Sequence, residues 1–322
     1  MTSSHASAHP RPLIEQRADP WVLRHQGRYY FIASVPEYDR LELRAADSIA
    51  GLASAPAQTV WTQPDSGPLS ALIWAPELHR IGDTWAIYFA AAPSREIVDG
   101  LFQHRMYAIT CQTDDPLTGD WREPVPIETH LDSFCLDATT FRHRDRTYYV
   151  WAQKDPAVPG NSNLYIAAMA SPTRLTGTPV RLSVPEYDWE TRGFLVNEGP
   201  AVVERHGRLF LTYSASATDE NYCMGLLWAD ADSDPLDPES WSKSPTPVFQ
   251  SDPEHRIFGP GHSCFTVAGD GVTDLLVYHA RTYTDIQGDP LWDPNRHTFV
   301  KPIRWTDEGF PDFGRAGEGI LG

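Results

Sequence analysis

The fold is indicated most clearly by the stretch NEGPAVV, residues 197–203. Its one charged residue, Glu198, stands beside a Gly-Pro pair, and apolar residues follow at once. A charged segment at residues 204–208 comes next, and then a second strand-like run, LFLTYS, at residues 209–214. Two such runs around a polar turn predict a β-hairpin whose entrance presents a carboxylate next to buried chain.

The same arrangement occurs five times along the chain. In each copy a polar residue precedes a short apolar run, a polar turn and a second run rich in aromatic or β-branched residues. The polar residues that open the copies are separated by 58, 60, 61 and 64 positions. Repeats of this length, with several short strands each, are typical of β-propeller blades. The five opening residues are Asp19, Glu77, Asp137, Glu198 and His262.

A second feature closes three of the copies. The segments DDPLTGDW at residues 114–121 and DPLDPESW at residues 234–241 each follow a strand-like run, and SPTRLTG at residues 171–177 is a looser version. Two features in a constant order are a specific signal of internal repetition. The sequence therefore predicts an all-β fold, a five-bladed β-propeller with antiparallel four-stranded blades around a central funnel.

Length and composition fit one large β domain. The chain has 322 residues, with 28 Pro and 22 Gly, as expected for many short strands joined by tight turns. The repeats continue to the end of the chain without a linker, so we expect residues 16–322 to form one propeller domain. Residues 1–15 are expected to be a loose N-terminal tail, unless they return to close the ring.

The charge of the chain excludes two classes of partner. The formal net charge is −17, whereas binding to nucleic acid depends on Lys and Arg residues that neutralise phosphates. We therefore expect no nucleic-acid partner, and the same charge argues against anionic membranes. No oligomeric state is predicted.

Four cysteines lie in different repeats without CxxC spacing, so no zinc or redox motif results, and we expect four reduced, partly buried thiols. Residues 1–16 contain no apolar segment of the kind found in secretory signal peptides, and no later run approaches about 20 apolar residues. On this basis the protein is expected to be soluble and cytoplasmic.

The five opening residues are expected to lie close together. The first strand of each propeller blade lines the central channel, so equivalent positions converge on the axis. Several carboxylates in one small funnel repel one another and are unfavourable unless the protein uses them. Carboxylates with perturbed pKa values in a cleft are what acid–base catalysis requires.

Six short motifs extend this pattern. They are ADPW at residues 18–21, WAPE at 74–77, LDAT at 136–139, NEGP at 197–200, GPGH at 259–262 and DEGFP at 307–311. In content and order they resemble glycoside hydrolase family 43, five-bladed propeller enzymes that cleave α-L-arabinofuranosides and β-D-xylosides with inversion. The resemblance covers nearly the whole chain from Asp19 onward. Related fructosidases have Arg-Asp-Pro at the third-blade carboxylate, and LDA at residues 136–138 argues against that activity.

The resemblance implies roles for three carboxylates. Asp19 is the expected general base, Glu198 the general acid, and Asp137 the third carboxylate that orients the acid and tunes its pKa. Inversion requires one protonated and one ionised carboxyl group about 6.5–9.5 Å apart. An ionised Asp137 near Glu198 is expected to raise the pKa of Glu198, because like charges resist joint ionisation.

Further residues are expected at the substrate pocket. Trp21 and Trp74 flank the funnel positions and belong either to the sugar pocket or to the core. Glu77 is the second-blade member of the set and is expected to contact the substrate. Arg281 either reaches toward the sugar, as the resemblance implies, or forms a surface pair. His262 either lies near a calcium or other cation held through water, or is hydrogen-bonded in the channel without a metal.

The predicted function is exo-acting hydrolysis that releases L-arabinose from α-1,5-linked arabino-oligosaccharides or arabinan, with no cofactor required for the chemistry. The alternatives are a β-D-xylosidase or an endo-arabinanase of the same family, and a sugar-binding propeller without activity. The exo mode requires walls around the funnel, for which the segments 34–40, 91–105 and 283–296 are long enough.

Overall fold

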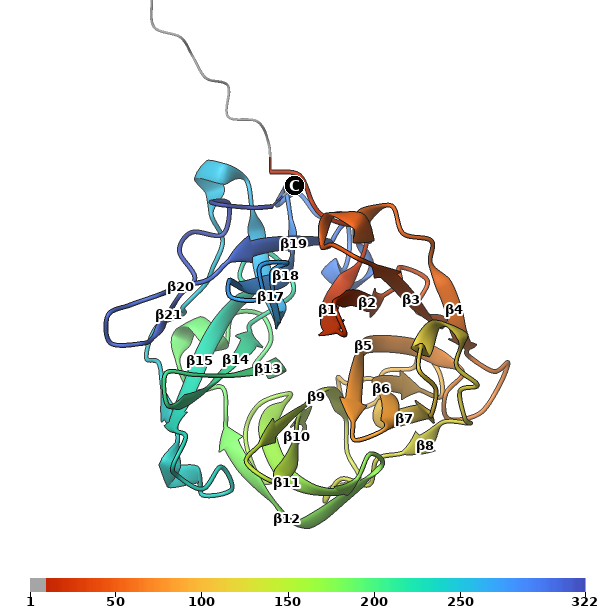
Figure 1. Ribbon diagram of the computed structural model, residues 1–322. Coiled ribbons are helices and arrows are strands. Elements are labelled where there is room, and N and C mark those ends of the chain that lie inside the picture. Colours follow the sequence, from red (N-terminus) through yellow and green to blue (C-terminus); the bar gives the residue numbers. More distant parts are fainter. Residues whose placement is uncertain (1–9, 322) are drawn as a thin grey trace, which may run out of the picture.

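The computed structural model describes residues 10–321. Five antiparallel sheets stand in a ring around a central axis, each with its first strand innermost (Figure 1). The predicted five-bladed β-propeller is therefore confirmed. Within the described residues, no helix is long and apolar enough to cross a membrane.

The first three blades are four-stranded sheets in which sequential strands are neighbours. Their strands are β1 (Ala18–His25), β2 (Arg28–Ser34), β3 (Arg40–Ala46) and β4 (Gln58–Thr62); β5 (Ala71–Ile81), β6 (Thr84–Ala92), β7 (Arg105–Cys111) and β8 (Val125–Pro126); β9 (Cys135–His143), β10 (Arg146–Gln153), β11 (Asn163–Ser171) and β12 (Arg174–Ser183).

The fourth blade also has four strands, the fifth has three, and a small hairpin follows. These strands are β13 (Asn197–Arg205), β14 (Arg208–Ala215), β15 (Cys223–Asp230) and β16 (Ser242–Lys243); β17 (Phe258–Val267), β18 (Asp274–Arg281) and β19 (His297–Pro302); β20 (Arg304–Trp305) and β21 (Pro311–Asp312). Short 3-10 helices lie in the connections: η1 (Ala50–Ala53), η2 (Pro116–Thr118), η3 (Asp188–Glu190), η4 (Pro238–Ser240), η5 (Pro253–His255) and η6 (Pro290–Trp292).

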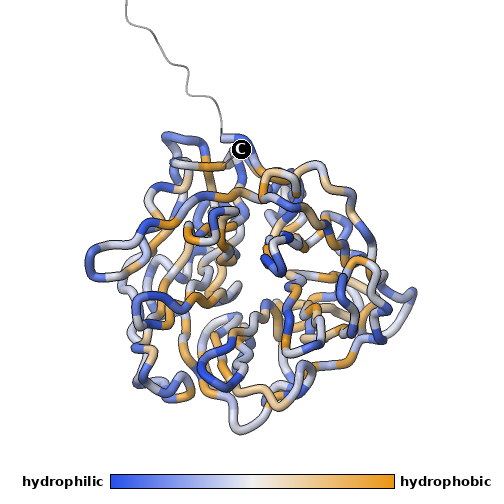
Figure 2. The backbone as a smooth tube through the Cα atoms, in the orientation of Figure 1, coloured by the Kyte–Doolittle hydropathy of each residue, from blue (hydrophilic) through white to orange (hydrophobic). Residues whose placement is uncertain are grey.

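The hydrophobic core lies between adjacent blades. The second strand of a blade is covered on both faces, so nearly every residue of β6 and β14 is buried, and β6 is apolar along almost its whole length. Figure 2 shows these hydrophobic segments within the ring, whereas the loop between β20 and β21 at the left edge is hydrophilic. The four cysteines are buried and unpaired.

The ring is closed at β19 by both described ends of the chain. The backbone N–H of Leu13 donates to the carbonyl of Thr298 at 2.8 Å, and Ile14 forms a bridge with the same residue. On the C-terminal side, the N–H of Leu321 donates to the carbonyl of Val300 at 2.8 Å. The two ends meet at the top of Figure 1. Leu13 and Ile14 are buried, so this part of the expected tail returns to the ring, and residues 1–9 lie outside the described residues.

Each innermost strand is interrupted by a β-bulge near its start, where the pairing with the second strand shifts register. One residue of each bulge has left-handed backbone geometry, which redirects its side chain. These residues are Asp19 (φ 54°), Ala75 (φ 45°), Asp137 (φ 51°), Gly199 (φ 55°) and His262 (φ 43°), and β5 and β17 each have an earlier shift with Leu72 (φ 57°) and Gly259 (φ 59°).

The positions of the bulges show that the alignment of the five repeats made from the sequence was wrong in the second and fourth blades. The sequence aligned Glu77 and Glu198 with Asp19, Asp137 and His262, but the bulge residues of the second and fourth blades are Ala75 and Gly199. Glu77 lies two residues further along its strand, and Glu198 lies one residue before its bulge. The sequence spacing missed this offset because a bulge inserts residues into one strand without changing the hydrophobic pattern that follows it.

Candidate active site

One cavity of about 180 Å³ lies at the axis, on the side of the ring where the bulges are. Its polar lining comes from blades that are far apart in the sequence. The main polar residues are Asp19, Asp137, Glu198, Tyr222, His262 and Arg296. The structure therefore brings together the three predicted catalytic carboxylates and His262.

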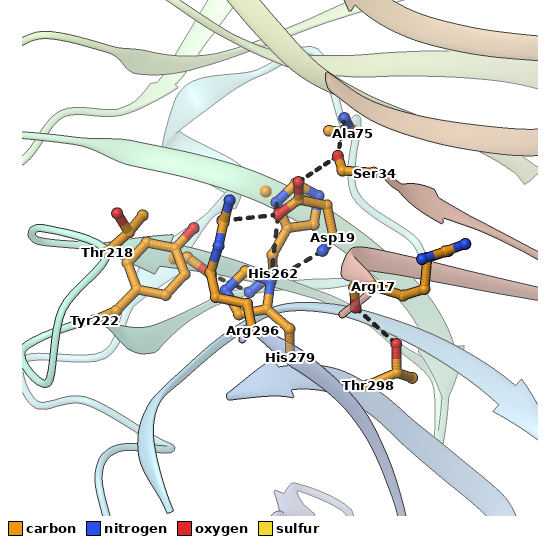
Figure 3. A network of polar contacts seen from close by, with 12 residues as sticks. Arg17, Asp19, Ser34, Ala75, Thr218, Tyr222, His262, His279, Arg296 and Thr298 are labelled. Atoms are coloured by element: carbon orange, nitrogen blue, oxygen red, sulfur yellow. Dashed lines mark hydrogen bonds and ion pairs between the residues drawn. The ribbon is translucent and has the colours of Figure 1, made fainter. Parts of the chain in front are cut away.

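Asp19 is held by partners on three sides (Figure 3). Its Oδ2 accepts a hydrogen bond from the Ser34 hydroxyl at 2.6 Å, and its Oδ1 lies 3.3 Å from Nδ1 of His262. Nη1 of Arg296 is 3.5 Å from the same oxygen, and the backbone N–H of Asp19 donates to Nδ1 of His279 at 3.0 Å. Burial alone would raise the pKa of Asp19, but His262, Arg296 and His279 together hold that pKa well below its usual value. Asp19 is therefore ionised near neutral pH and can accept a proton.

Glu198 has the opposite electrostatic character. Its Oε1 accepts a hydrogen bond from the Tyr222 hydroxyl at 2.9 Å. Burial raises the pKa of Glu198 to about 7, the hydrogen bond from Tyr222 opposes this rise, and the negative charge of Asp19 adds to it. Glu198 can therefore hold a proton close to neutral pH and donate it to a leaving oxygen.

Asp137 links these two carboxylates. Its Oδ2 accepts a hydrogen bond from the backbone N–H of Gly199 at 3.0 Å and lies 3.6 Å from Nδ1 of His262. Burial, and then the charges of Glu198 and Asp19, raise the pKa of Asp137 well above its usual value. Asp137 and Glu198 therefore titrate as a pair, and the last proton on the pair is held more tightly than either carboxyl would hold it alone.

Gly199 is required by the same arrangement. Its φ is +55°, and a Cβ at this position would lie 3.1 Å from the ring of His262. Any larger residue would strain the backbone and displace His262.

His262 lies between two carboxylates. Its backbone N–H donates to the Ser214 hydroxyl at 2.7 Å. Burial lowers the pKa of His262, and the charge of Asp19 partly opposes this shift. In residues 10–321 no group of three or more His, Cys, Asp or Glu side chains is arranged to hold a metal ion. Calcium prefers six to eight oxygen ligands. The protein side chains around His262 therefore do not form a direct calcium site, and a cation held through water stays a prediction.

Of the predicted substrate-binding residues, Trp74 lines the cavity and stacks on His104 with ring centroids 3.9 Å apart. Trp21 does not line it. The indole N–H of Trp21 donates to the carbonyl of Leu78 at 2.7 Å, and its ring packs 4.5 Å from that of His79. Trp21 thus belongs to the contact between the first two blades, the core alternative that the sequence left open.

Glu77 and Arg281 also lie outside the lining of the cavity. Glu77 is buried, with Oε2 2.8 Å from Nε2 of His79, because the bulge sets it deeper along its strand than Asp19. Arg281 donates to the carbonyls of Thr218 at 2.5 Å and Pro290 at 2.6 Å, so it joins two loops.

The sequence reasoning missed Arg296 and Tyr222. Arg296 is buried and also donates to the hydroxyl of Tyr38 at 2.8 Å, which joins the 34–40 and 283–296 segments. Arg296 ends the 283–296 segment, which the sequence indicated as a wall of the funnel, so its position could have suggested that it reaches the site. Tyr222 directly precedes β15, outside the repeated motifs, and its ring stacks on His279 with centroids 5.5 Å apart.

A carboxylate kept ionised beside a second one whose pKa is raised to about 7, at the axis of a five-bladed propeller, is the arrangement of a glycoside hydrolase. Comparison with known families identifies the family of glycoside hydrolases. The chain belongs to glycosyl hydrolases family 43, whose model matches residues 9–311.

The chain is similar to proteins that are named as arabinofuranosidases. It is 48% identical to an extracellular exo-α-(1→5)-L-arabinofuranosidase of Streptomyces avermitilis, covering 97% of this chain and 66% of that one. It is 49% identical to a protein of the same name from Streptomyces chartreusis, covering 89% of this chain and 88% of the relative. The crystal structure of an α-L-arabinofuranosidase from Lactobacillus brevis superposes with a TM-score of 0.93 at 59% identity, covering 95% and 96% of the two chains. This chain thus spans about two thirds of the length of the Streptomyces avermitilis relative.

Both Streptomyces relatives are named extracellular. This finding contradicts the expectation of a cytoplasmic protein, which was wrong. The expectation used only the lack of an apolar segment in residues 1–16 and of a long apolar run later in the chain. Sorting signals act outside the folded domain, so the sequence pattern of a propeller does not record its compartment.

Proposed function

We propose that this protein is an inverting, exo-acting α-L-arabinofuranosidase that releases L-arabinose from α-1,5-linked arabino-oligosaccharides. The names of the Streptomyces relatives support the substrate. The observation that carries the proposal is the contrast between Asp19, whose pKa is held low, and Glu198, whose pKa is raised to about 7, in one cavity.

The proposed mechanism assigns one proton transfer to each of these residues. Glu198 donates its proton to the glycosidic oxygen as the bond to the sugar breaks. Asp19 removes a proton from the water that attacks the anomeric carbon from the opposite face. Asp137 and Glu198 titrate as a pair, and the charge repulsion between them makes the last proton on the pair harder to lose. Arg296 and His262 keep Asp19 ionised.

The exo mode is supported by the walls of the cavity. Ile97 and Leu101 from the 91–105 segment, and Leu291 from the 283–296 segment, line it. Tyr38 from the 34–40 segment contacts Arg296. The sequence did not identify the connection between β12 and β13, which adds Phe194 and Val196. Walls from several blades favour a pocket that accepts the end of a chain over an open cleft.

Two assays test the proposal. Turnover of 4-nitrophenyl α-L-arabinofuranoside is compared with that of 4-nitrophenyl β-D-xyloside, and linear arabinan digests are sampled from the first minutes. We expect preference for the arabinoside and arabinose as the sole early product. Preference for the xyloside would support a β-xylosidase. Early mixed oligosaccharides would support an endo-arabinanase, and a lack of turnover on every substrate would support a sugar-binding protein.

In the same assays, Glu198→Gln tests the role of the acid. Glu123→Gln, at an exposed carboxylate outside the cavity, is its matched control.

A further inference from the structure

The mouth of the cavity is unusually apolar. Eight large hydrophobic residues of residues 10–321 are exposed, and five of them lie in the three connections that surround the cavity. Ile97 and Phe194 are 58% and 52% exposed and line the cavity directly. The five residues are Ile97, Val98, Phe194, Leu195 and Trp292.

These side chains continue an apolar surface that begins inside the cavity. Phe102 lines the cavity between Trp74 and Trp292, with ring centroids 5.4 Å and 6.4 Å away respectively. Leu101 and Leu291 line the cavity as well. We call Ile97, Leu101, Phe102, Phe194 and Leu291 the apolar collar.

Two polar side chains near the collar, Asn161 and Asp289, each use one oxygen atom to hold the loops. Oδ1 of Asn161 accepts a hydrogen bond from the backbone N–H of Leu195 at 3.2 Å. Oδ1 of Asp289 accepts one from the N–H of Leu291 at 2.9 Å. Asp19, Asp137, Tyr222 and Arg296 are buried, whereas Ile97 and Phe194 of the collar are exposed. Aliphatic side chains such as Ile97 cannot hydrogen-bond the hydroxyl groups of an acceptor sugar, whereas they gain free energy when an apolar group covers them.

The position of the collar indicates which part of the substrate contacts it. The sugar that is cleaved must lie beside Asp19 and Glu198, so the group attached through the glycosidic oxygen passes the collar on its way to solvent. We propose that the apolar collar binds an apolar aglycone and that α-L-arabinofuranosides of apolar alcohols are a second class of substrate. This inference rests on the proposed function. In the reaction, Glu198 protonates the alcohol oxygen, water supplies the hydroxyl at the anomeric carbon, and arabinose and the free alcohol are released.

The test uses n-alkyl α-L-arabinofuranosides with methyl, butyl and hexyl groups. Their leaving alcohols have similar acidity, so differences in kcat/KM report binding of the chain and not chemistry. A fully buried methylene strengthens binding about fourfold, and a half-buried one about twofold. We expect kcat/KM to rise roughly 30-fold from methyl to hexyl at about twofold per methylene. A glycoside of diethylene glycol monomethyl ether, of similar length but polar, controls for length and should stay near the methyl value.

The variants locate the effect. Phe194→Ser should reduce the hexyl-to-methyl ratio severalfold, whereas Val272→Ser, at an exposed apolar residue in the hairpin between β17 and β18, should leave the ratio unchanged. Equal kcat/KM for the hexyl and ether glycosides would overturn the inference, as would a ratio that survives Phe194→Ser. Dimerisation of the wild type that is lost in Phe194→Ser, seen by sedimentation, would assign the collar to a second copy instead.

The inference and the proposed function fail in different ways. If the methyl glycoside is hydrolysed but kcat/KM is the same for the methyl, butyl and hexyl glycosides, only the inference about the collar is overturned. If no glycoside is hydrolysed, the proposed function fails, and dissociation constants of the same series on Glu198→Gln still decide whether the collar binds alkyl chains. A Kd that does not fall between the methyl and hexyl glycosides would overturn the inference in that case.

Discussion

The hydroxyl of Tyr222 lies 2.9 Å from Oε1 of Glu198 and donates a hydrogen bond to it. Tyr222 itself is buried and stacked on His279, so its hydroxyl has little freedom to move. This contact fixes the direction of the Glu198 carboxyl and, because it stabilises the ionised form, lowers the pKa of Glu198 below the value that burial alone would give.

Tyr222→Phe should therefore raise the pKa of Glu198. The acid must be protonated to act, so the alkaline limb of the kcat/KM profile should move to higher pH. Loss of orientation should lower the maximal rate at the same time. The pH profile of arabino-oligosaccharide hydrolysis measures both effects, and a limb that stays in place or moves to lower pH would show that Tyr222 does not act on Glu198.

Asp137→Asn should shift the same limb in the opposite direction. The substitution keeps the shape of the side chain and removes the charge that makes the last proton on the pair harder to lose. The pKa of Glu198 should fall, and activity should be lost at lower pH than in the wild type, together with a large rate loss. A normal profile at near-normal rate would make Asp137 a structural residue.

Glu198→Ala and Asp19→Ala should differ in their dependence on the leaving group. Both should lower hydrolysis of natural oligosaccharides by at least about 100-fold. Glu198→Ala should retain far more activity on 4-nitrophenyl α-L-arabinofuranoside, whose leaving group departs with little protonation, whereas Asp19→Ala should lose both activities. If Glu198→Ala loses the two activities equally, Glu198 is not the general acid.

Gly199→Ala should destabilise the protein and the site together. The added Cβ meets the ring of His262 at 3.1 Å in a left-handed backbone conformation, which costs about 1–3 kcal/mol in the free energy of unfolding. Gly269→Ala is the matched control, because that glycine has no positive φ and no atom within 4 Å of the added Cβ. Urea unfolding compares the two variants, and equal stability would mean that the fourth-blade bulge tolerates a side chain.

The repeats made the architecture predictable from the sequence. Each blade must cover its neighbours, so the apolar runs and turns recur, and the channel position of Asp19, Asp137 and Glu198 follows from their place at the start of innermost strands. Glu77 shows the limit of this reasoning. A bulge shifts the direction of a side chain without leaving a mark in the hydrophobic pattern, so the spacing could not tell that Glu77 lies beyond the cavity.

Residues outside the repeats were harder to predict. Arg296 reaches Asp19 from a connection whose course depends on packing against Tyr38. Phe194 comes from the connection before β13, which the sequence did not identify as a wall. The positions of such residues are set by tertiary contacts between blades, which a periodic pattern does not encode.

The stereochemistry of the first product tests the central claim most directly. If Asp19 activates water on the face opposite the leaving group that Glu198 protonates, an α-linked substrate must yield β-L-arabinofuranose first. Proton NMR of a fresh digest, recorded before mutarotation mixes the anomers, measures this outcome. Initial accumulation of the β anomer is the predicted result, and initial accumulation of the α anomer would contradict the assignment of Asp19 and Glu198 as base and acid of an inverting enzyme.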